Sequence, residues 1–295
     1  MKTGFVCIAG RPNVGKSTLL NSIIGEKIAI TADKPQTTRN RIRGVFTERG
    51  PGGNGFQIVF IDTPGIHKPA NKLGAYMTDT AVNTLREVDA VLFVADGPAE
   101  GRDRDVLQLL AGIDTPRFAA VNKIDLLSPE AFKSIFDSYA RTGFFRQVVG
   151  ISARDGKNVG KLVELIKETT EEGPMFFPED IVTDHPERFI VAEIIREKLL
   201  RYLDQEVPHG VAVALESYAE ETTLTRIGAV IYCEKKSHKG IIIGKEGRKL
   251  KGIGKSAREE MENLLGVKVY LELWVKVREN WRNSDFMLNS LGYNE

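Results

Sequence analysis

The sequence of 295 residues predicts an α/β fold class, with a mostly parallel six-stranded sheet followed by a smaller α+β domain. Short apolar runs alternate with amphipathic segments up to residue 172, a pattern typical of a sheet with helices on both faces. Two prolines, a glycine and several acidic residues then interrupt the alternation. We therefore expect a first domain at residues 1–172, a linker at 173–182 and a second domain at 183–295.

The first domain contains six apolar runs with the length and flanking turn residues of buried strands. The expected strands are residues 5–9, 43–47, 57–61, 90–95, 117–121 and 148–151. Because only the glycine-rich turn at residues 50–55 separates the second strand from the third, these two are predicted to form an antiparallel hairpin. Longer segments with helical spacing precede or follow the other strands. The expected helices are residues 16–24, 75–85, 104–110, 129–139 and 159–169.

The second domain is predicted to mix helices with a few strands and to end on a short helix. A long helix is expected first, and two helices are expected on either side of residues 244–247. The other elements expected are the first helix at 188–202 and strands at 211–218, 229–233 and 267–277.

The charge is balanced overall but unevenly distributed. Lys and Arg number 41 and Asp and Glu number 40, so the net charge of +1 indicates no class of partner. Residues 235–258, however, hold nine basic residues and one acidic residue. Such a concentration of positive charge favours binding of an anionic ligand. Cys7 and Cys233 are expected to be buried free thiols.

A glycine-rich segment links the first predicted strand to the first predicted helix. Residues 10–17 match G-x-x-x-x-G-K-[ST], a loop whose backbone N–H groups surround the phosphates of a nucleoside triphosphate. In this pattern Lys16 contacts the β- and γ-phosphates, and the Ser17 hydroxyl takes one position around a Mg²⁺ ion. The residues predicted to bind nucleotide here are Gly10, Arg11, Pro12, Asn13, Val14, Gly15, Lys16, Ser17 and Thr18.

A second phosphate-facing segment follows the third predicted strand and reads Asp62, Thr63, Pro64 and Gly65. Asp62 is placed to reach the Mg²⁺ ion through a water molecule, and the Gly65 amide is placed to contact the γ-phosphate. Ligands of open α/β sheets bind at the carboxyl ends of the strands, where this segment begins.

Two segments near the end of the first domain predict that the base is guanine. Asn122 and Lys123 precede Asp125, whose carboxylate can accept hydrogen bonds from the N1–H and 2-amino groups of guanine. Adenine offers neither donor and would leave a desolvated carboxylate unpaired. Ser152 and Ala153 follow the last strand, where a backbone N–H can donate to the guanine carbonyl.

With these four segments in this order, the first domain resembles the translation-factor class of GTPases. The resemblance implies a threonine in a mobile loop that contacts Mg²⁺ and the γ-phosphate. Thr38 is predicted to be this residue, with Thr37 as the alternative. The implied catalytic residues are Lys16, Thr38, Gly65 and Asn13, and the implied Mg²⁺ ligands are Ser17, Thr38 and, through water, Asp62.

Two residues bear on the rate of hydrolysis. Ras-like GTPases carry a glutamine after the D-x-x-G segment to orient the attacking water. Ile66 stands there in this chain and cannot form a hydrogen bond through its side chain, so we expect slow intrinsic turnover. Asn13 matches the asparagine with which related GTPases hold a potassium ion beside the phosphates, where a cation neutralises developing charge. The alternative is that Asn13 only stabilises the loop.

The basic block at residues 235–258 surrounds a G-x-x-G segment at residues 244–247. Paired glycines allow a sharp turn and a close approach of a nucleic-acid backbone, and the preceding isoleucines are predicted to form the floor of a narrow groove. The block contains no aromatic residue, which favours a KH-type groove for single-stranded RNA over a stacking platform. The predicted RNA-binding residues are Lys239, Ile241, Ile243, Gly244, Lys245, Glu246, Gly247, Arg248, Lys249 and Lys251.

Together with residues 193–198 and 272–277, this domain order resembles the Era family of GTPases over essentially the full length. The resemblance implies a cytoplasmic, Mg²⁺-dependent GTPase that binds the 3′ end of 16S ribosomal RNA, not DNA, during assembly of the 30S ribosomal subunit. It also implies a fraction bound peripherally to the inner membrane. Two alternatives stay open: a membrane-surface GTPase that uses the basic block on anionic lipid, and a module that binds nucleotide but barely hydrolyses it. We also hypothesise that GTP orders residues 31–41 and 62–76 and thereby couples the two domains.

Overall fold

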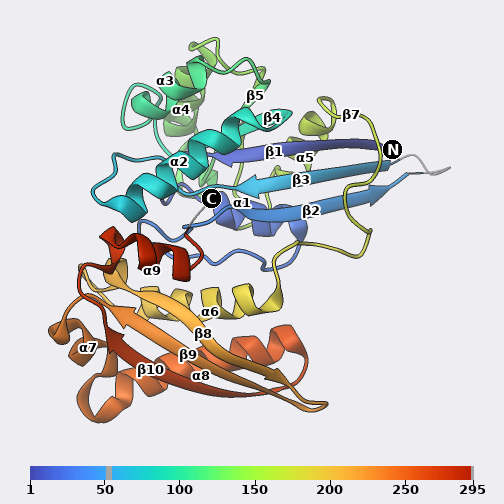
Figure 1. Ribbon diagram of the computed structural model, residues 1–295. Coiled ribbons are helices and arrows are strands. Elements are labelled where there is room, and N and C mark those ends of the chain that lie inside the picture. Colours follow the sequence, from blue (N-terminus) through green and yellow to red (C-terminus); the bar gives the residue numbers. More distant parts are fainter. Residues whose placement is uncertain (51–54, 294–295) are drawn as a thin grey trace. The chain divides into compact units, whose positions relative to one another are not determined.

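The computed structural model describes residues 1–50 and 55–293, which form two compact units (Figure 1). The first unit comprises Met1–Ala29, Thr38–Lys68 and Met77–Asp184, and the second comprises Ile30–Thr37, Pro69–Tyr76 and His185–Glu295. Two short early segments, residues 30–37 and 69–76, thus belong to the second unit, which the domain bounds expected from the sequence do not include. Residues 51–54 of the predicted turn lie outside the described residues.

The first unit is built on a mixed sheet whose six main strands run in the order β2-β3-β1-β4-β5-β6. β2 pairs antiparallel with β3, which confirms the predicted hairpin, and the other main pairs are parallel. A short strand, β7, pairs antiparallel with β1. The strands are β1 (Lys2–Ala9), β2 (Ile42–Arg49), β3 (Gly55–Asp62), β4 (Ala90–Ala95), β5 (Arg117–Val121), β6 (Gln147–Gly150) and β7 (Glu171–Glu172).

Helices cover both faces of this sheet (Figure 1). Residues of α2, α3 and α4 share one hydrophobic core with alternate strand residues such as Cys7, Val91 and Phe93. Since successive strand residues point to opposite faces, α1 and α5, which contact each other, cover the other face. The helices are α1 (Lys16–Ile24), α2 (Lys72–Arg86), α3 (Arg104–Ala111), α4 (Pro129–Ala140) and α5 (Val159–Lys167), with a 3₁₀ turn at Ile124–Leu126.

The segment predicted to be a linker packs on the first unit instead. The side-chain amide of the buried Gln57 explains this: its Oε1 accepts from the backbone N–H groups of Phe176 and Phe177 at 2.7 and 3.0 Å. Farther along, the N–H of Val45 donates to the carbonyl of Val182 at 2.8 Å. Polar groups of β2 and β3 thus hold residues 173–182, the predicted linker, against the sheet of the first unit.

The second unit consists of a three-stranded sheet in the order β10-β9-β8 with helices packed against it. β8 pairs antiparallel with β9, whereas β10 runs parallel to β9. Its elements are α6 (Glu187–Tyr202), β8 (Ala212–Glu220), β9 (Leu224–Cys233), α7 (Lys236–Ile243), α8 (Arg248–Leu265), β10 (Lys268–Val277) and α9 (Asp285–Ser290), with 3₁₀ turns at Pro208–Gly210, Lys245–Gly247 and Trp281–Asn283. The predicted helices and strands of this domain are thus present.

Both cysteines are buried and free, as predicted. Trp281 is fully buried, and its Nε1 donates to the carbonyl of Gly210 at 2.9 Å, so it belongs to the packing of the second unit. None of the helices in the described part of the chain combines the length and the hydropathy of a membrane span.

Candidate functional site

The phosphate-binding loop runs from the carboxyl end of β1 to the first turn of α1. Lys16 is 6% exposed, and its Nζ donates a 3.0 Å hydrogen bond to the carbonyl of Arg11 within the loop. Burial lowers the pKa of Lys16 from its ordinary value, because the ammonium group is desolvated. Phosphate groups bound in the loop would stabilise its charged form.

Three oxygen-bearing side chains meet beside this loop. The Ser17 hydroxyl lies 2.8 Å from the Thr38 hydroxyl and donates a 2.5 Å hydrogen bond to Oδ2 of Asp62. Oδ1 of Asp62 is buried without a hydrogen-bond partner among the described residues, and burial raises the pKa of this carboxyl group. A hard divalent cation would satisfy these oxygen atoms, so the residues fit a Mg²⁺ ion.

The geometry distinguishes the two threonine candidates. The Thr37 hydroxyl donates to the carbonyl of Lys34 at 2.6 Å and is therefore turned back onto its own loop. The Thr38 hydroxyl instead donates to Asp62 at 3.2 Å, next to Ser17. The structure favours Thr38 over Thr37 as the threonine that contacts Mg²⁺ and the γ-phosphate.

The segment after β3 approaches the phosphate loop closely enough to require glycine. A Cβ atom on Gly65 would lie 2.6 Å from the backbone nitrogen of Pro12. The Thr63 hydroxyl fixes the segment by donating to the carbonyl of Ile8 at 2.9 Å. Ile66 packs in the hydrophobic core, so residue 66 supplies no hydrogen-bonding side chain for an attacking water.

Asn122 connects the loops that are predicted to surround the base. Its Nδ2 donates to the carbonyl of Val14 at 2.8 Å, and its Oδ1 accepts from the N–H of Ala153 at 2.9 Å. Lys123 adds a third link, because its Nζ donates to the carbonyl of Asn13 at 2.8 Å. The structure therefore brings the residues predicted to bind phosphate and guanine together at the carboxyl ends of the strands.

Asp125, the predicted acceptor for guanine, lies at the edge of these loops with a side chain that is 16% exposed. An interaction with the Ser152 hydroxyl lowers the pKa of Asp125, so its carboxylate is ionised at neutral pH. Arg154 pairs with this carboxylate at 3.0 Å and was not predicted from the sequence. Its position directly after Ser152 and Ala153 was the available signal.

Two further carboxylates that the sequence analysis missed support the same loops. Asp96 accepts from Lys123 Nζ at 2.7 Å and from Arg11 Nη2 at 3.1 Å. Asp103 is fully buried and accepts from Arg11 Nε at 2.5 Å and from the Tyr139 hydroxyl at 2.6 Å. The Arg11 side chain is thus held by protein carboxylates. Neither aspartate lies in a nucleotide-binding motif, so only the fold reveals this role.

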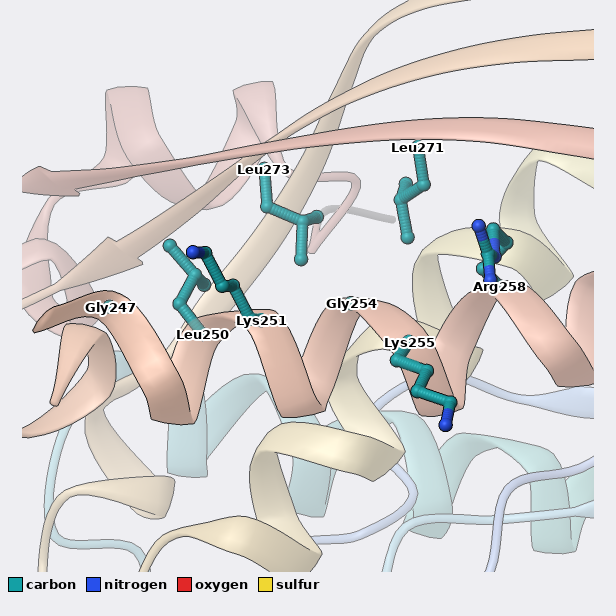
Figure 2. Close-up of a pocket in the computed structure, with 8 residues that line it drawn as sticks. All are labelled: Gly247, Leu250, Lys251, Gly254, Lys255, Arg258, Leu271 and Leu273. Carbon is teal, nitrogen blue, oxygen red and sulfur yellow. The ribbon is translucent and has the colours of Figure 1, made fainter.

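A groove of about 600 Å³ lies between α8 and β10 of the second unit (Figure 2). Figure 2 shows Leu271 and Leu273 pointing from β10 toward α8, where they form an apolar floor. Basic side chains of α8 stand along the same groove. The lining residues are Gly247, Leu250, Lys251, Gly254, Lys255, Arg258, Leu271 and Leu273.

The groove begins at a sharp turn between α7 and α8, as the glycine pair predicts. Gly244 and Gly247 have φ angles of 70° and 75°, and Glu246 between them has a φ of 53°. A Cβ atom on Gly244 would also lie 2.8 Å from that of Lys249. The turn therefore depends on glycine, and Arg248, the first residue of α8, is exposed directly after it.

Two family descriptions match the chain: "50S ribosome-binding GTPase" at residues 5–123 and "KH domain" at residues 206–282. Over 299 aligned residues the chain is 60% identical to the GTPase Era of Alkaliphilus oremlandii, with 99% of each protein covered. It is 52% identical to the GTPase Era of Clostridioides difficile, with 100% of this chain and 99% of that one covered. The chain belongs to the Era family of GTPases.

Solved structures of Era proteins share this fold. An Era variant from Aquifex aeolicus bound to GDP and aluminium fluoride is 39% identical, with a TM-score of 0.95 and both chains fully covered. Era in complex with MgGDPNP and nucleotides 1506–1542 of 16S ribosomal RNA has a TM-score of 0.94 at 39% identity, again over both full chains. The first domain is therefore a GTPase of the Era type and the second a KH domain.

The groove between α8 and β10 shares only part of its lining with the predicted RNA-binding residues. Of the ten residues predicted, Gly247 and Lys251 line it. The isoleucines do not form its floor, since Ile242 is fully buried in the core and the other two are not among the lining residues. α7 ends at the glycine turn, so the leucines of β10 take that place. Lys255 and Arg258 follow Lys251 at helical spacing, which was the signal that the sequence analysis missed.

Proposed function

We propose that this Era-family GTPase binds GTP with Mg²⁺ in its first unit and the single-stranded 3′ end of 16S ribosomal RNA in its KH groove. We further propose that it acts in assembly of the 30S subunit in the cytoplasm, with a fraction bound peripherally to the inner membrane. The observation that carries the RNA part is the groove, with glycines at its mouth, leucines on its floor and basic residues along it. An Era protein of 39% identity bound to a 16S ribosomal RNA fragment supports the choice of RNA.

The shape of the groove suits single-stranded nucleic acid. Gly247 and Gly254 leave room for a sugar–phosphate backbone to approach α8 closely. The leucines provide apolar contact for unstacked bases, and the cations of α8 attract phosphates. A helix on a lipid surface would instead require an unbroken basic face and would gain nothing from a recess with an apolar floor.

At the GTPase site the side chains have separate tasks. Lys16 places a positive charge at the phosphates, and Asp125 accepts hydrogen bonds from guanine. Ser17, Thr38 and Asp62 would hold Mg²⁺, which neutralises charge on the β- and γ-phosphates when it is bound. Asn122 and Lys123 position the loops rather than the reacting atoms, because their side chains bond to backbone carbonyls of residues 13 and 14.

We also propose slow intrinsic turnover that a potassium ion at Asn13 accelerates. Ile66 offers no hydrogen-bonding side chain to an attacking water. Asn13 adopts a φ of 65°, an uncommon conformation for a residue other than glycine, and Lys123 holds its carbonyl. Backbone strain of this kind is often retained at ligand sites, which supports a binding role for Asn13.

GTP and RNA are proposed to influence each other through the segments at residues 30–37 and 69–76. Both belong to the second unit, although each adjoins a nucleotide-contacting segment in the sequence. Within the second unit, the N–H of Thr31 donates to Glu197 at 3.0 Å, and Lys72 pairs with Asp285 at 2.6 Å. A γ-phosphate that moves either segment would therefore disturb contacts of the RNA-binding unit.

Charge reversal in the groove tests the RNA assignment. We compare the full chain carrying Lys251→Glu with a control, Lys133→Glu, whose lysine lies on α4 of the first unit and is 75% exposed. Filter binding uses the 16S fragment of nucleotides 1506–1542, and pelleting uses vesicles of anionic phosphatidylglycerol. We expect Lys251→Glu to weaken RNA binding about tenfold or more and the control to leave it unchanged. Unchanged RNA binding together with lost vesicle binding would favour the membrane-surface alternative.

A further inference from the structure

The loop that carries Thr38 is held by a helix of the RNA-binding unit. Residues 30–37, which lead directly to Thr38, pack in the second unit. There they contact α6: the N–H of Thr31 donates to the fully buried Glu197, and Lys34 Nζ donates to the carbonyl of Leu203 at 2.8 Å. Thr31 and Lys34 thus tie this segment to α6 and to Leu203, the residue that follows α6.

The contact nearest to Thr38 in the sequence comes from Arg196. This side chain is 1% exposed, and its guanidinium group donates to the carbonyls of Gln36, at 3.4 Å, and of Thr37. On its other side it forms a bidentate pair with Glu193, at 2.7 and 2.5 Å. Two carbonyls and one carboxylate surround this buried cation, and each compensates part of the hydration that it loses. The guanidinium group is therefore held in one position.

The backbone that Arg196 holds is an unusual one. Gln36 has a φ of 62°, a left-handed conformation that non-glycine residues seldom adopt without support. Two consecutive carbonyls, of Gln36 and Thr37, are directed at the same guanidinium group. The next residue is Thr38, whose hydroxyl lies beside Ser17 and Asp62. Fixing the two preceding peptide groups therefore limits where Thr38 can lie.

We propose that Arg196 is a positioning residue for GTP: by holding the carbonyls of Gln36 and Thr37, it keeps Thr38 at the Mg²⁺ and γ-phosphate site. This inference rests on the proposed role of Thr38. A loop that is already positioned loses less conformational freedom when GTP binds, so the affinity for GTP rises. GDP lacks the γ-phosphate that Thr38 would contact, so positioning of the loop raises the affinity for GDP only a little. Helix α6 of the RNA-binding unit thereby contributes to discrimination between GTP and GDP.

The test compares nucleotide affinities of the full chain with Mg²⁺ present. Arg196→Met keeps the aliphatic volume and removes the donors, whereas Arg196→Lys keeps the charge but loses the forked geometry. Arg188→Met, an exposed residue on the same helix, is the matched control. Equilibrium binding of GDP and of the analogue GDPNP is measured by calorimetry. We expect Arg196→Met to lower GDPNP affinity about tenfold with GDP affinity within about twofold, Arg196→Lys to recover part of the loss, and Arg188→Met to change neither.

Equal losses for GDP and GDPNP in Arg196→Met would overturn the proposal, since they would show a general structural role. Unchanged affinity for both nucleotides would overturn it as well. Thr38→Ala tests the assignment of Thr38 to the γ-phosphate site separately from the role of Arg196. If Thr38→Ala lowers GDPNP affinity selectively and Arg196→Met does not, Thr38 keeps its role and Arg196 loses the one proposed here. RNA affinity without nucleotide is measured in parallel to check that the KH groove is intact.

Discussion

Asp62 and Asp125 show how one site gives two carboxylates different properties. Burial raises the pKa of Asp62, and its Oδ1 has no hydrogen-bond partner among the described residues. The Ser152 hydroxyl lowers the pKa of Asp125, which lies nearer the surface. A cation would favour the ionised form of the first, whereas the second is an anion before any ligand arrives. At the scale of single residues, Asp62 therefore suits a metal ion and Asp125 suits the donors of a base.

Replacing Asp125 by asparagine should change the preferred base. The amide cannot accept two hydrogen bonds from guanine, but its NH₂ group can donate to the 2-carbonyl of xanthine. We expect Asp125→Asn to lose about 100-fold or more in GDP affinity and to gain affinity for xanthosine diphosphate. Competition binding with GDP, XDP and ADP measures this. A variant that gains no XDP affinity, or an unaltered chain that binds ATP as well as GTP, would contradict the assignment of Asp125.

The lowered pKa of Asp125 predicts the pH range of guanine recognition. Because the pKa lies below its ordinary value of about 3.9, the carboxylate stays ionised from pH 8 to about 5.5 and is lost as acceptor only at lower pH. Inosine diphosphate (IDP) lacks the 2-amino group of GDP but carries the same diphosphate, so titration of the phosphates affects both nucleotides alike. We therefore expect the ratio of GDP to IDP affinities to be constant over this range, measured by competition binding. A ratio that falls toward one between pH 7 and 5.5 would show that Asp125 takes up a proton there.

The potassium proposal is tested at Asn13. We expect hydrolysis by the full chain to be about tenfold faster in KCl than in NaCl, because an ion beside the phosphates would neutralise developing charge. Asn13→Ala should lose that difference while it retains GDP binding in both salts. Phosphate release under multiple turnover is the measurement. Equal rates of the unaltered chain in the two salts would leave Asn13 with a role in loop stability alone.

At the scale of elements, α8 must be a stable helix and must also form one side of a groove, and these two requirements oppose each other at Gly254. It is a helix of 18 residues, and two of the residues lining its groove, Gly247 and Gly254, are glycines. Glycine inside a helix costs conformational entropy, so Gly254 weakens the element. A Cβ atom there would meet Cδ1 of Leu273 at 3.4 Å, an ordinary contact, and would occupy part of the groove. The glycine therefore serves the groove rather than the stability of α8.

Gly254→Ala should separate these effects. We expect a gain of about 0.5–1 kcal/mol in the free energy of unfolding of the KH unit, because alanine favours the helix, together with weaker RNA binding. Thermal unfolding and filter binding to the 16S fragment measure the two quantities. Gly160→Ala on α5, where a Cβ atom meets nothing within 4 Å, is the control and should leave RNA binding unchanged. Unaltered RNA affinity in Gly254→Ala would exclude close contact with the backbone of RNA at this residue.

At the scale of the whole molecule, the two units are interleaved along the chain. Residues 30–37 and 69–76 leave the first unit, pack in the second unit and return. Helix α2 crosses this division, since it begins at Lys72 and ends at Arg86. The residues that adjoin the phosphate site are therefore covalently continuous with residues held by the KH unit. This arrangement favours coupling, because a change in one set of contacts must be accommodated by the other.

Coupling must act in both directions if it exists. We expect the affinity of the full chain for the 16S fragment to differ about fivefold or more between the GDPNP, GDP and nucleotide-free states. By linkage, RNA should shift the ratio of GDPNP to GDP affinity by the same factor. Filter binding and calorimetry give the two sides of this cycle. RNA affinity that is identical in all three states would remove the switch proposal, although GTP hydrolysis and RNA binding would each persist.

The sequence by itself determined the GTPase motifs, their order, the parallel sheet and the turn at residues 244–247. These features depend on local spacing: a glycine-rich turn after a buried strand places backbone amides and a lysine together without distant contacts. The sequence could therefore predict which segments meet at the carboxyl ends of the strands and that the second domain, a KH domain, contains a basic glycine turn.

Only the tertiary structure decided which distant residues meet. It favours Thr38 over Thr37, brings Asp96 and Asp103 to Arg11, and places leucines of β10 on the floor of the groove. It also assigns residues 30–37 to the second unit. Such contacts join parts of the chain tens to more than a hundred residues apart, and no local pattern encodes them, because they arise when buried groups find compensating partners in the folded chain.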